Sequence, residues 1–123
     1  MKHLLLLAIL AAAPAAAQTQ RQIDADAARD YARADAALNV AYRAAVARAR
    51  AADAEPGARL PNPGYQAALL TAQRAWLVFR DAECRNQGYS YFGGTMEWMT
   101  ATYCKQELTE QRTKQLQPRP EGE

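Results

Sequence analysis

The 123-residue chain has only one histidine and two cysteines. The scarcity of these residues argues against enzymes and metal-binding proteins that depend on them. Histidine is the usual general base at neutral pH and a common zinc ligand. The single histidine, His3, lies in the extreme N-terminal segment, so the rest of the chain has none for catalysis or metal binding. We therefore expect a protein that is not an enzyme and that holds no metal or cofactor.

Neither sign of charge dominates, and no hydrophobic run is long. The formal net charge is +2, and a nucleic-acid partner would require a clustered basic face, so none is expected. The apolar run Leu4–Leu10 is far shorter than the roughly 20 residues that span a bilayer. Because no cysteine stands directly after the end of this N-terminal segment at Ala17, where a lipid would be attached, we expect no stable membrane anchor.

The N-terminal segment Met1–Ala17 has the layout of a secretory signal peptide. Lys2 precedes the apolar run, and Pro14-Ala15-Ala16-Ala17 comes before the polar Gln18. A positive start, a short apolar stretch and small residues before the cut are typical of such a segment. We expect cleavage near Ala17 and a periplasmic or secreted protein, Gln18–Glu123; the alternative is a buried N-terminal helix.

The remaining sequence predicts an all-α fold, a small antiparallel three-helix domain over residues 18–117 followed by a flexible tail over residues 118–123. Alanine-rich segments favour helix, and clusters of proline and glycine mark the joints. The expected helices cover residues 20–53 with Thr19 as the cap, 63–86 with Asn62 as the cap, and 96–116 with Thr95 as the cap.

The two cysteines, Cys84 and Cys104, fall on the second and third expected helices. In an oxidising compartment a bridge between them would close a loop of about 20 residues and stabilise the fold by roughly 3 kcal/mol. The alternative is a pair of free or metal-binding thiols, although two sulfurs without histidine make a poor zinc site. We favour the disulfide.

Polar residues fall within the apolar arc of the second expected helix. Arg80 and Glu83 lie one turn apart, and Gln73 lies two turns before Arg80. One interpretation is a polar pocket with a carboxylate as acid or base. The interpretation we favour is a satisfied structural network that fixes helix register and includes Arg112, because unpaired buried charge is costly.

An aromatic loop joins the second and third expected helices. Tyr89, Tyr91 and Phe92 lie in it, and Trp98 follows in the third helix. Large aromatics on a loop are typical anchors of protein interfaces, so these residues and Arg85 are the candidate partner-binding residues. The alternative is that the rings close over the end of a small helical core.

The central motif resembles the LprI-type domain family, which is named for a lysozyme inhibitor. The resemblance rests on Ala72–Cys84 (AQRAWLVFRDAEC), on Gly93-Gly94-Thr95, Cys104, Leu108-Thr109, Arg112 and Leu116, and on the upstream segment Ala34–Tyr42. It implies an exported all-helical domain whose cysteines form disulfides. Family members often carry another cysteine pair upstream, which residues 18–33 lack.

Two functions follow from the resemblance and the loop. The first is an exported, non-enzymatic binding protein of the cell envelope that inhibits a lysozyme-type glycoside hydrolase by occluding its cleft. The alternative is a periplasmic protein-interaction or stress-response module with an unrelated partner, favoured by an apolar group of Met96, Met99 and Tyr103 on the third helix. The sequence leaves the oligomeric state open.

Overall fold

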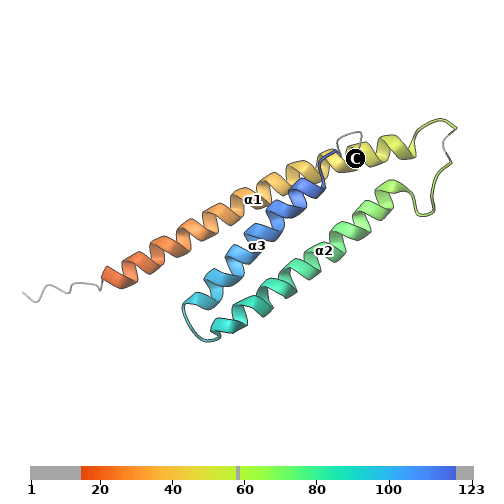
Figure 1. Cartoon of the computed structure of the whole chain (residues 1–123). Helices are drawn as coiled ribbons and strands as arrows, with labels where there is room; N and C mark the ends of the chain where they lie inside the picture. Colours follow the sequence, from red (N-terminus) through yellow and green to blue (C-terminus); the bar gives the residue numbers. More distant parts are fainter. Residues whose placement is uncertain (1–14, 58, 119–123) are drawn as a thin grey trace, which may run out of the picture.

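The computed structural model describes residues 15–57 and 59–118, which form three helices and contain no strand. The elements are α1 (Ala15–Asp53), α2 (Tyr65–Gly88), a short 3-10 turn η1 (Tyr89–Tyr91) and α3 (Met96–Gln115). α1 and α3 run in the same direction, and α2 runs opposite to both (Figure 1). The predicted antiparallel three-helix fold is confirmed. Most of the expected signal peptide and of the expected tail lies outside the described residues.

α1 begins at Ala15, upstream of the predicted start, and continues through Thr19 to Asp53. Thr19 is therefore not the N-cap of this helix. Alanine has the highest helix propensity, and nothing in the Ala15–Ala17 segment terminates a helix, so the local sequence favours this extension. Within the described part of the chain, no helix is both long and apolar enough to cross a membrane.

The start of α2 is capped by the end of α1. Gly64 is the N-cap residue, and the Asp53 carboxylate accepts hydrogen bonds from the backbone N–H groups of Tyr65 (2.8 Å) and Gln66 (3.0 Å). Asn62 is therefore not the cap. A Cβ atom at Gly64 would lie 2.9 Å from Asp53 Oδ1, so a larger residue here would require the Asp53 side chain to shift. The contact ties the ends of α1 and α2 together and favours their antiparallel course.

The apolar core is small and lies toward the end of the molecule where α3 finishes. Leu38 and Ala45 of α1 are buried with Leu116, and Leu69 and Trp76 of α2 pack against them. α3 lies between α1 and α2 in Figure 1. The Arg48 guanidinium of α1 also donates to the Leu116 carbonyl, which fixes the end of α3 against α1.

The buried face of α2 is more polar than its apolar pattern suggests. Gln73, Arg80 and Cys84 are buried, whereas Tyr65 and Phe79, which share an apolar stripe, are 51% and 54% exposed. The interior beside α2 is thus filled by hydrogen-bonding groups and a disulfide, with the stripe turned partly to solvent. This arrangement leaves an apolar surface along α2.

α3 has two apolar groups, and they differ in exposure. Leu116 is buried and Leu108 is half-buried, so this side of the helix faces the core. Met96 and Tyr103, on the other side, are 39% and 46% exposed. The second group therefore lies largely at the surface.

Candidate functional site

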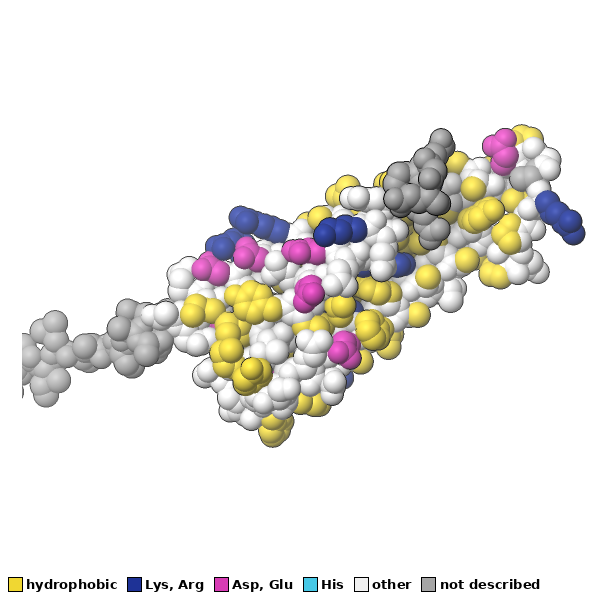
Figure 2. All heavy atoms as spheres, in the orientation of Figure 1, with side chains coloured by type: hydrophobic (Ala, Val, Ile, Leu, Met, Phe, Trp, Pro, Cys, Tyr) yellow, Lys and Arg dark blue, Asp and Glu magenta, His cyan; other side chains and the backbone are white. Residues whose placement is uncertain are grey.

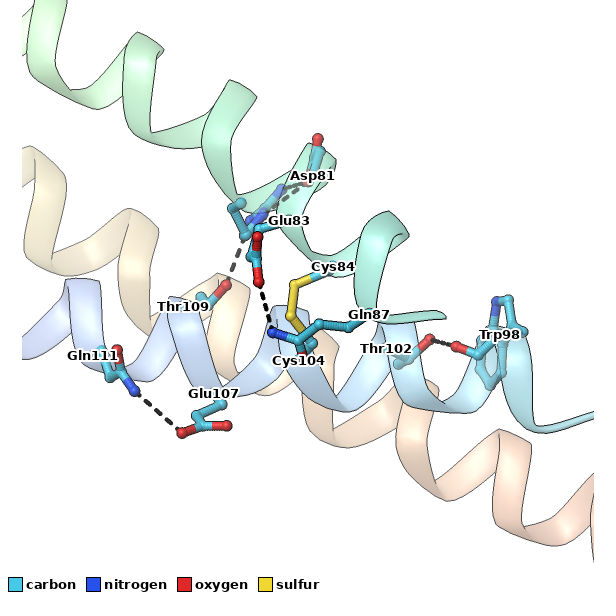
Figure 3. The surroundings of a disulfide bond; sticks show 11 residues. Asp81, Glu83, Cys84, Gln87, Trp98, Thr102, Cys104, Glu107, Thr109 and Gln111 are labelled. Atoms are coloured by element: carbon cyan, nitrogen blue, oxygen red, sulfur yellow. Dashed lines mark hydrogen bonds and ion pairs between the residues drawn. A yellow bond between two sulfur atoms is a disulfide. The ribbon is translucent and has the colours of Figure 1, made fainter. Parts of the chain in front are cut away.

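A disulfide joins α2 to α3 close to the turn between them. The Cys84 and Cys104 sulfurs are bonded at 2.03 Å, with 5.4 Å between the Cα atoms, and both residues are buried (Figure 3). The predicted bridge is confirmed. It closes the hairpin that carries every candidate partner-binding residue, since Arg85, the aromatic loop and Trp98 all lie between the two cysteines.

Arg80 lies at the junction of the three helices and is only 6% exposed. Its guanidinium contacts the Asp81 carboxylate at 2.9 Å through two nitrogens, and Nη1 lies 3.7 Å from Asp35 Oδ1 on α1. Nη1 also donates to the Thr109 hydroxyl of α3 at 3.4 Å. This residue therefore links side chains of all three helices.

Two aromatic rings complete the surroundings of Arg80. The guanidinium carbon lies 5.3 Å from the centre of the Trp76 ring and 5.7 Å from that of Tyr31. Burial raises the pKa of the Tyr31 phenol, Arg80 opposes the rise, and the nearby Asp35 and Asp81 carboxylates add to it. The geometry is that of a satisfied structural cluster.

The other members of the predicted polar network lie in different places. Arg112 donates to the Gln73 amide oxygen at 3.0 Å and so bridges α3 to α2. Glu83 instead accepts a hydrogen bond from Gln87 on its own helix, as Figure 3 shows. The grouping of Glu83 with Arg80 needs this correction: Asp81, adjacent in sequence, reaches the guanidinium, and Asp35 comes from α1. Sequence spacing within one helix gave no signal for Asp35.

The closed end of the α2–α3 hairpin presents large aromatic side chains, and α1 continues past this turn (Figure 1). Phe92 is 79% exposed, and Tyr89, Tyr91 and Trp98 are each about half exposed, at 53%, 49% and 49%. The Tyr89 and Phe92 rings form an edge-to-face pair with centroids 6.2 Å apart. We call Tyr89, Tyr91, Phe92 and Trp98 the aromatic tip. Phe92 projects into solvent, whereas Tyr89, Tyr91 and Trp98 are each about half covered by the rest of the protein.

Backbone hydrogen bonds hold the aromatic tip in one shape. The Gly93 N–H donates to the Glu97 carboxylate at 2.8 Å, and the Gly94 N–H donates to the Tyr91 carbonyl at 2.9 Å. Gly93 has a φ of 76°, in the left-handed region that favours glycine. At the base of the turn, a Cβ atom at Gly88 would lie 3.0 Å from the Glu97 carbonyl oxygen, so glycine also permits the close approach of the two helices.

A pocket of about 350 Å³ lies beside the aromatic tip, between α2 and α3. Two glycines and an alanine form part of its wall. The remaining lining side chains are those of Asp81, Arg85, Glu97, Trp98 and Lys105. Asp81 is paired with Arg80, and Glu97 accepts from Gly93, whereas neither Arg85 nor Lys105 has an ion-pair partner among the described residues. The pocket therefore offers two free cations beside an indole ring.

The structure thus brings together Arg85 and Trp98 of the predicted partner-binding residues in one pocket, with Tyr89, Tyr91 and Phe92 at the turn above it. Lys105 and Glu97 were not predicted as site residues. Lys105 lies one position beyond Cys104, and only the disulfide pairing places it near Arg85. In the described part of the chain, no cluster of three or more acidic, cysteine or histidine residues could hold a metal ion.

These features define a small all-α protein with one disulfide and an aromatic surface at the closed end of the α2–α3 hairpin. The family model described as "Lysozyme inhibitor LprI" matches residues 11–116, so the chain belongs to this family. It is also 42% identical over 101 residues to the uncharacterized protein R02472 of Rhizobium meliloti (strain 1021), covering 81% of this chain and 73% of that protein. No solved structure matches. Because an inhibitor acts by binding its enzyme, membership in this family implies a protein partner.

Proposed function

We propose that the chain is exported to the periplasm or secreted and acts there as a non-enzymatic inhibitor of a lysozyme-type glycoside hydrolase. In this proposal the aromatic tip enters the substrate cleft of the enzyme and occludes it. The observation that carries the proposal is the exposure of four large aromatic side chains on a hairpin closed by the Cys84–Cys104 bridge. The family to which the chain belongs supports the choice of enzyme.

The geometry of the hairpin suits insertion into a cleft. Aromatic side chains bury large areas with little loss of conformational freedom, which makes them effective binding anchors. The disulfide and the turn hydrogen bonds hold them in place before binding, so less conformational entropy is lost on association. A hairpin turn braced in this way can present its aromatic side chains to a cleft.

The pocket beside the tip supplies charge complementarity. Glycoside hydrolases of this type use a pair of carboxyl groups that flank the scissile bond. Arg85 and Lys105 have no ion-pair partner among the described residues, so they are available for an acidic group of the enzyme when the tip is inserted. In this proposal binding weakens as salt concentration rises, because the two cations are partly exposed.

The test is the lysis of a cell-wall suspension by c-type and g-type lysozymes, titrated with oxidised Gln18–Glu123. The proposal requires saturable inhibition at near-equal molar amounts. The double substitution Tyr91→Ser with Phe92→Ser should raise the half-inhibitory concentration by up to about 1,000-fold, since anchor residues contribute about 2 kcal/mol each. Val40→Ser is the matched control, because Val40 is 60% exposed on α1, away from the tip.

Absence of inhibition with both enzyme classes would contradict the proposal. The second candidate, an interaction module with an unrelated envelope partner, would then be favoured by the exposed Met96 and Tyr103 on α3. Inhibition that survives the tip substitutions but is lost on Met96→Ser with Tyr103→Ser would move the binding surface from the turn to the flank of α3.

A further inference from the structure

α2 carries a second surface that the aromatic tip does not include. Six residues repeat at alternating separations of three and four, which places them on one seam of the helix. All are exposed, and hydrophobic side chains line the lower edge of the molecule in Figure 2, where α2 runs. We call these residues the α2 seam: Tyr65, Ala68, Ala72, Ala75, Phe79 and Ala82.

The α2 seam is apolar and uncharged. Tyr65 and Phe79 are 51% and 54% exposed, and the four residues between and beyond them are alanines. The core side of α2 is a different face, marked by the buried Gln73, Arg80 and Cys84. Exposure of two large rings on a charge-free line of alanines is typical of a surface that a second helix covers.

We propose that a second copy of the chain covers the α2 seam, with the two α2 helices packed antiparallel about a two-fold axis. In such a pair the centre lies between Ala72 and Ala75, and each of these alanines opposes the other in the second copy. Moving outward, Phe79 opposes Ala68, and Tyr65 opposes Ala82. Each layer of the contact therefore contains either one ring and one alanine or a pair of alanines. The surface is thus complementary to itself, as a two-fold contact requires.

The polar edge of the seam also fits this pairing. Glu83 directly follows Ala82 and lies on the same side of α2 as Tyr65, at the helical spacing of 3.6 residues per turn. In the antiparallel pair, Glu83 of one copy therefore lies beside Tyr65 of the other. The Tyr65 hydroxyl can donate a hydrogen bond to the Glu83 carboxylate of the other copy. The ends of the seam therefore match in hydrogen bonding, and its centre matches in shape.

The first test is sedimentation equilibrium of the oxidised protein at micromolar concentrations, where a single helix pair should associate measurably. The mass should be twice that of one chain. Ala75→Glu should reduce it to the monomer, because the carboxylate falls at the centre of the seam. Ala67→Glu, the same change at an exposed alanine of α2 outside the seam, should leave the dimer intact. A monomeric parent protein, or equal loss with both substitutions, would overturn the proposal.

A cross-linking experiment tests the antiparallel direction. A mixture of Ala72→Cys and Ala75→Cys chains should form a disulfide between the two variants under mild oxidation. Ala68→Cys alone should not, since its two copies lie about 16 Å apart along the helix at 1.5 Å per residue. Efficient cross-linking of Ala68→Cys to itself would show a parallel pair and contradict the proposal. Neither result depends on lysozyme, so failure here is distinguishable from failure of the proposed function.

Discussion

At the scale of single residues, Arg80 connects all three helices from a buried position. Its interactions contribute unequally to the free energy of unfolding. Its carboxylate partners Asp35 and Asp81 have side chains that are 44% and 47% exposed, and ion pairs with such partners contribute less than about 1 kcal/mol. The Trp76 and Tyr31 rings pack on the guanidinium, and each such contact contributes about 0.5–2 kcal/mol. The contacts of the guanidinium with the two rings therefore contribute more to stability than its two ion pairs.

These interactions predict unequal losses of stability for three substitutions. Asp81→Asn should lower the free energy of unfolding by less than about 1 kcal/mol, because an amide still accepts from Arg80. Arg80→Ala should lower it by about 3 kcal/mol, since packing is lost and the Thr109 hydroxyl loses its donor. Arg80→Lys should fall between them, because it keeps the charge but not the planar fork. Urea unfolding followed by far-UV circular dichroism measures all three, and equal costs would contradict the ranking.

The raised pKa of Tyr31 predicts that the free energy of unfolding depends on pH in the alkaline range. Burial raises the pKa of its phenol above the ordinary value of 10.0, with Asp35 and Asp81 acting in the same direction and Arg80 against it. The folded state therefore favours the neutral phenol, and this contribution is complete below pH 10 and lost as pH rises through the folded pKa. Tyr31→Phe should show a smaller fall in the free energy of unfolding above about pH 10 than the parent protein. Identical slopes in alkaline urea titrations would contradict the assignment.

At the scale of the elements, local chemistry predicted the helices better than their ends. The proline and glycine clusters near Glu55-Pro56-Gly57 and Pro61-Asn62-Pro63-Gly64 correctly separated α1 from α2. The cap of α2 could not be predicted, because its acceptor is Asp53, twelve residues before Tyr65 and on another helix. Asp35 beside Arg80 was missed for the same reason. Both contacts depend on how the helices pack, which periodicity does not encode.

The candidate site shows the same division. Aromatic residues in a loop predicted the aromatic tip, and the cysteine pair predicted the brace beneath it. Lys105 was not predicted as a site residue, although it follows Cys104 as Arg85 follows Cys84, so the predicted bridge was the signal that could have placed the two cations together. The exposed α2 seam was hidden, since an apolar stripe on a helix ordinarily indicates core. Here the core side of α2 is occupied by Gln73, Arg80 and Cys84.

The hairpin predicts that stability and inhibition depend together on the disulfide. The combined substitution Cys84→Ser with Cys104→Ser should lower the free energy of unfolding by about 3 kcal/mol, as expected for a loop of this length. Because the tip lies inside that loop, inhibition of lysozyme should weaken even at temperatures where the helices persist. Reducing the parent protein with dithiothreitol should reproduce both effects. Full inhibition by the double variant would show that the bridge is not needed to position the tip.

At the scale of the whole molecule, the aromatic tip and the α2 seam lie on separate parts of the same hairpin. In the proposed antiparallel dimer, the two tips point away from each other and lie roughly 45 Å apart, at 1.5 Å per residue along α2. Each tip then remains free to enter its own enzyme. The dimer would therefore present two enzyme-binding tips that do not contact each other.

This arrangement predicts a complex of two enzymes with one dimer. Light scattering coupled to size exclusion should give a mass equal to two chains and two lysozymes, whereas Ala75→Glu should form a complex of one chain with one lysozyme. When lysozyme acts on a soluble substrate, its inhibition per chain should be the same for the parent protein and for Ala75→Glu, because the seam does not contact the enzyme. The double variant Tyr91→Ser with Phe92→Ser should show the reverse, a dimer that does not inhibit. A dimer that binds a single enzyme would mean that one tip is blocked, and the antiparallel arrangement would then be wrong.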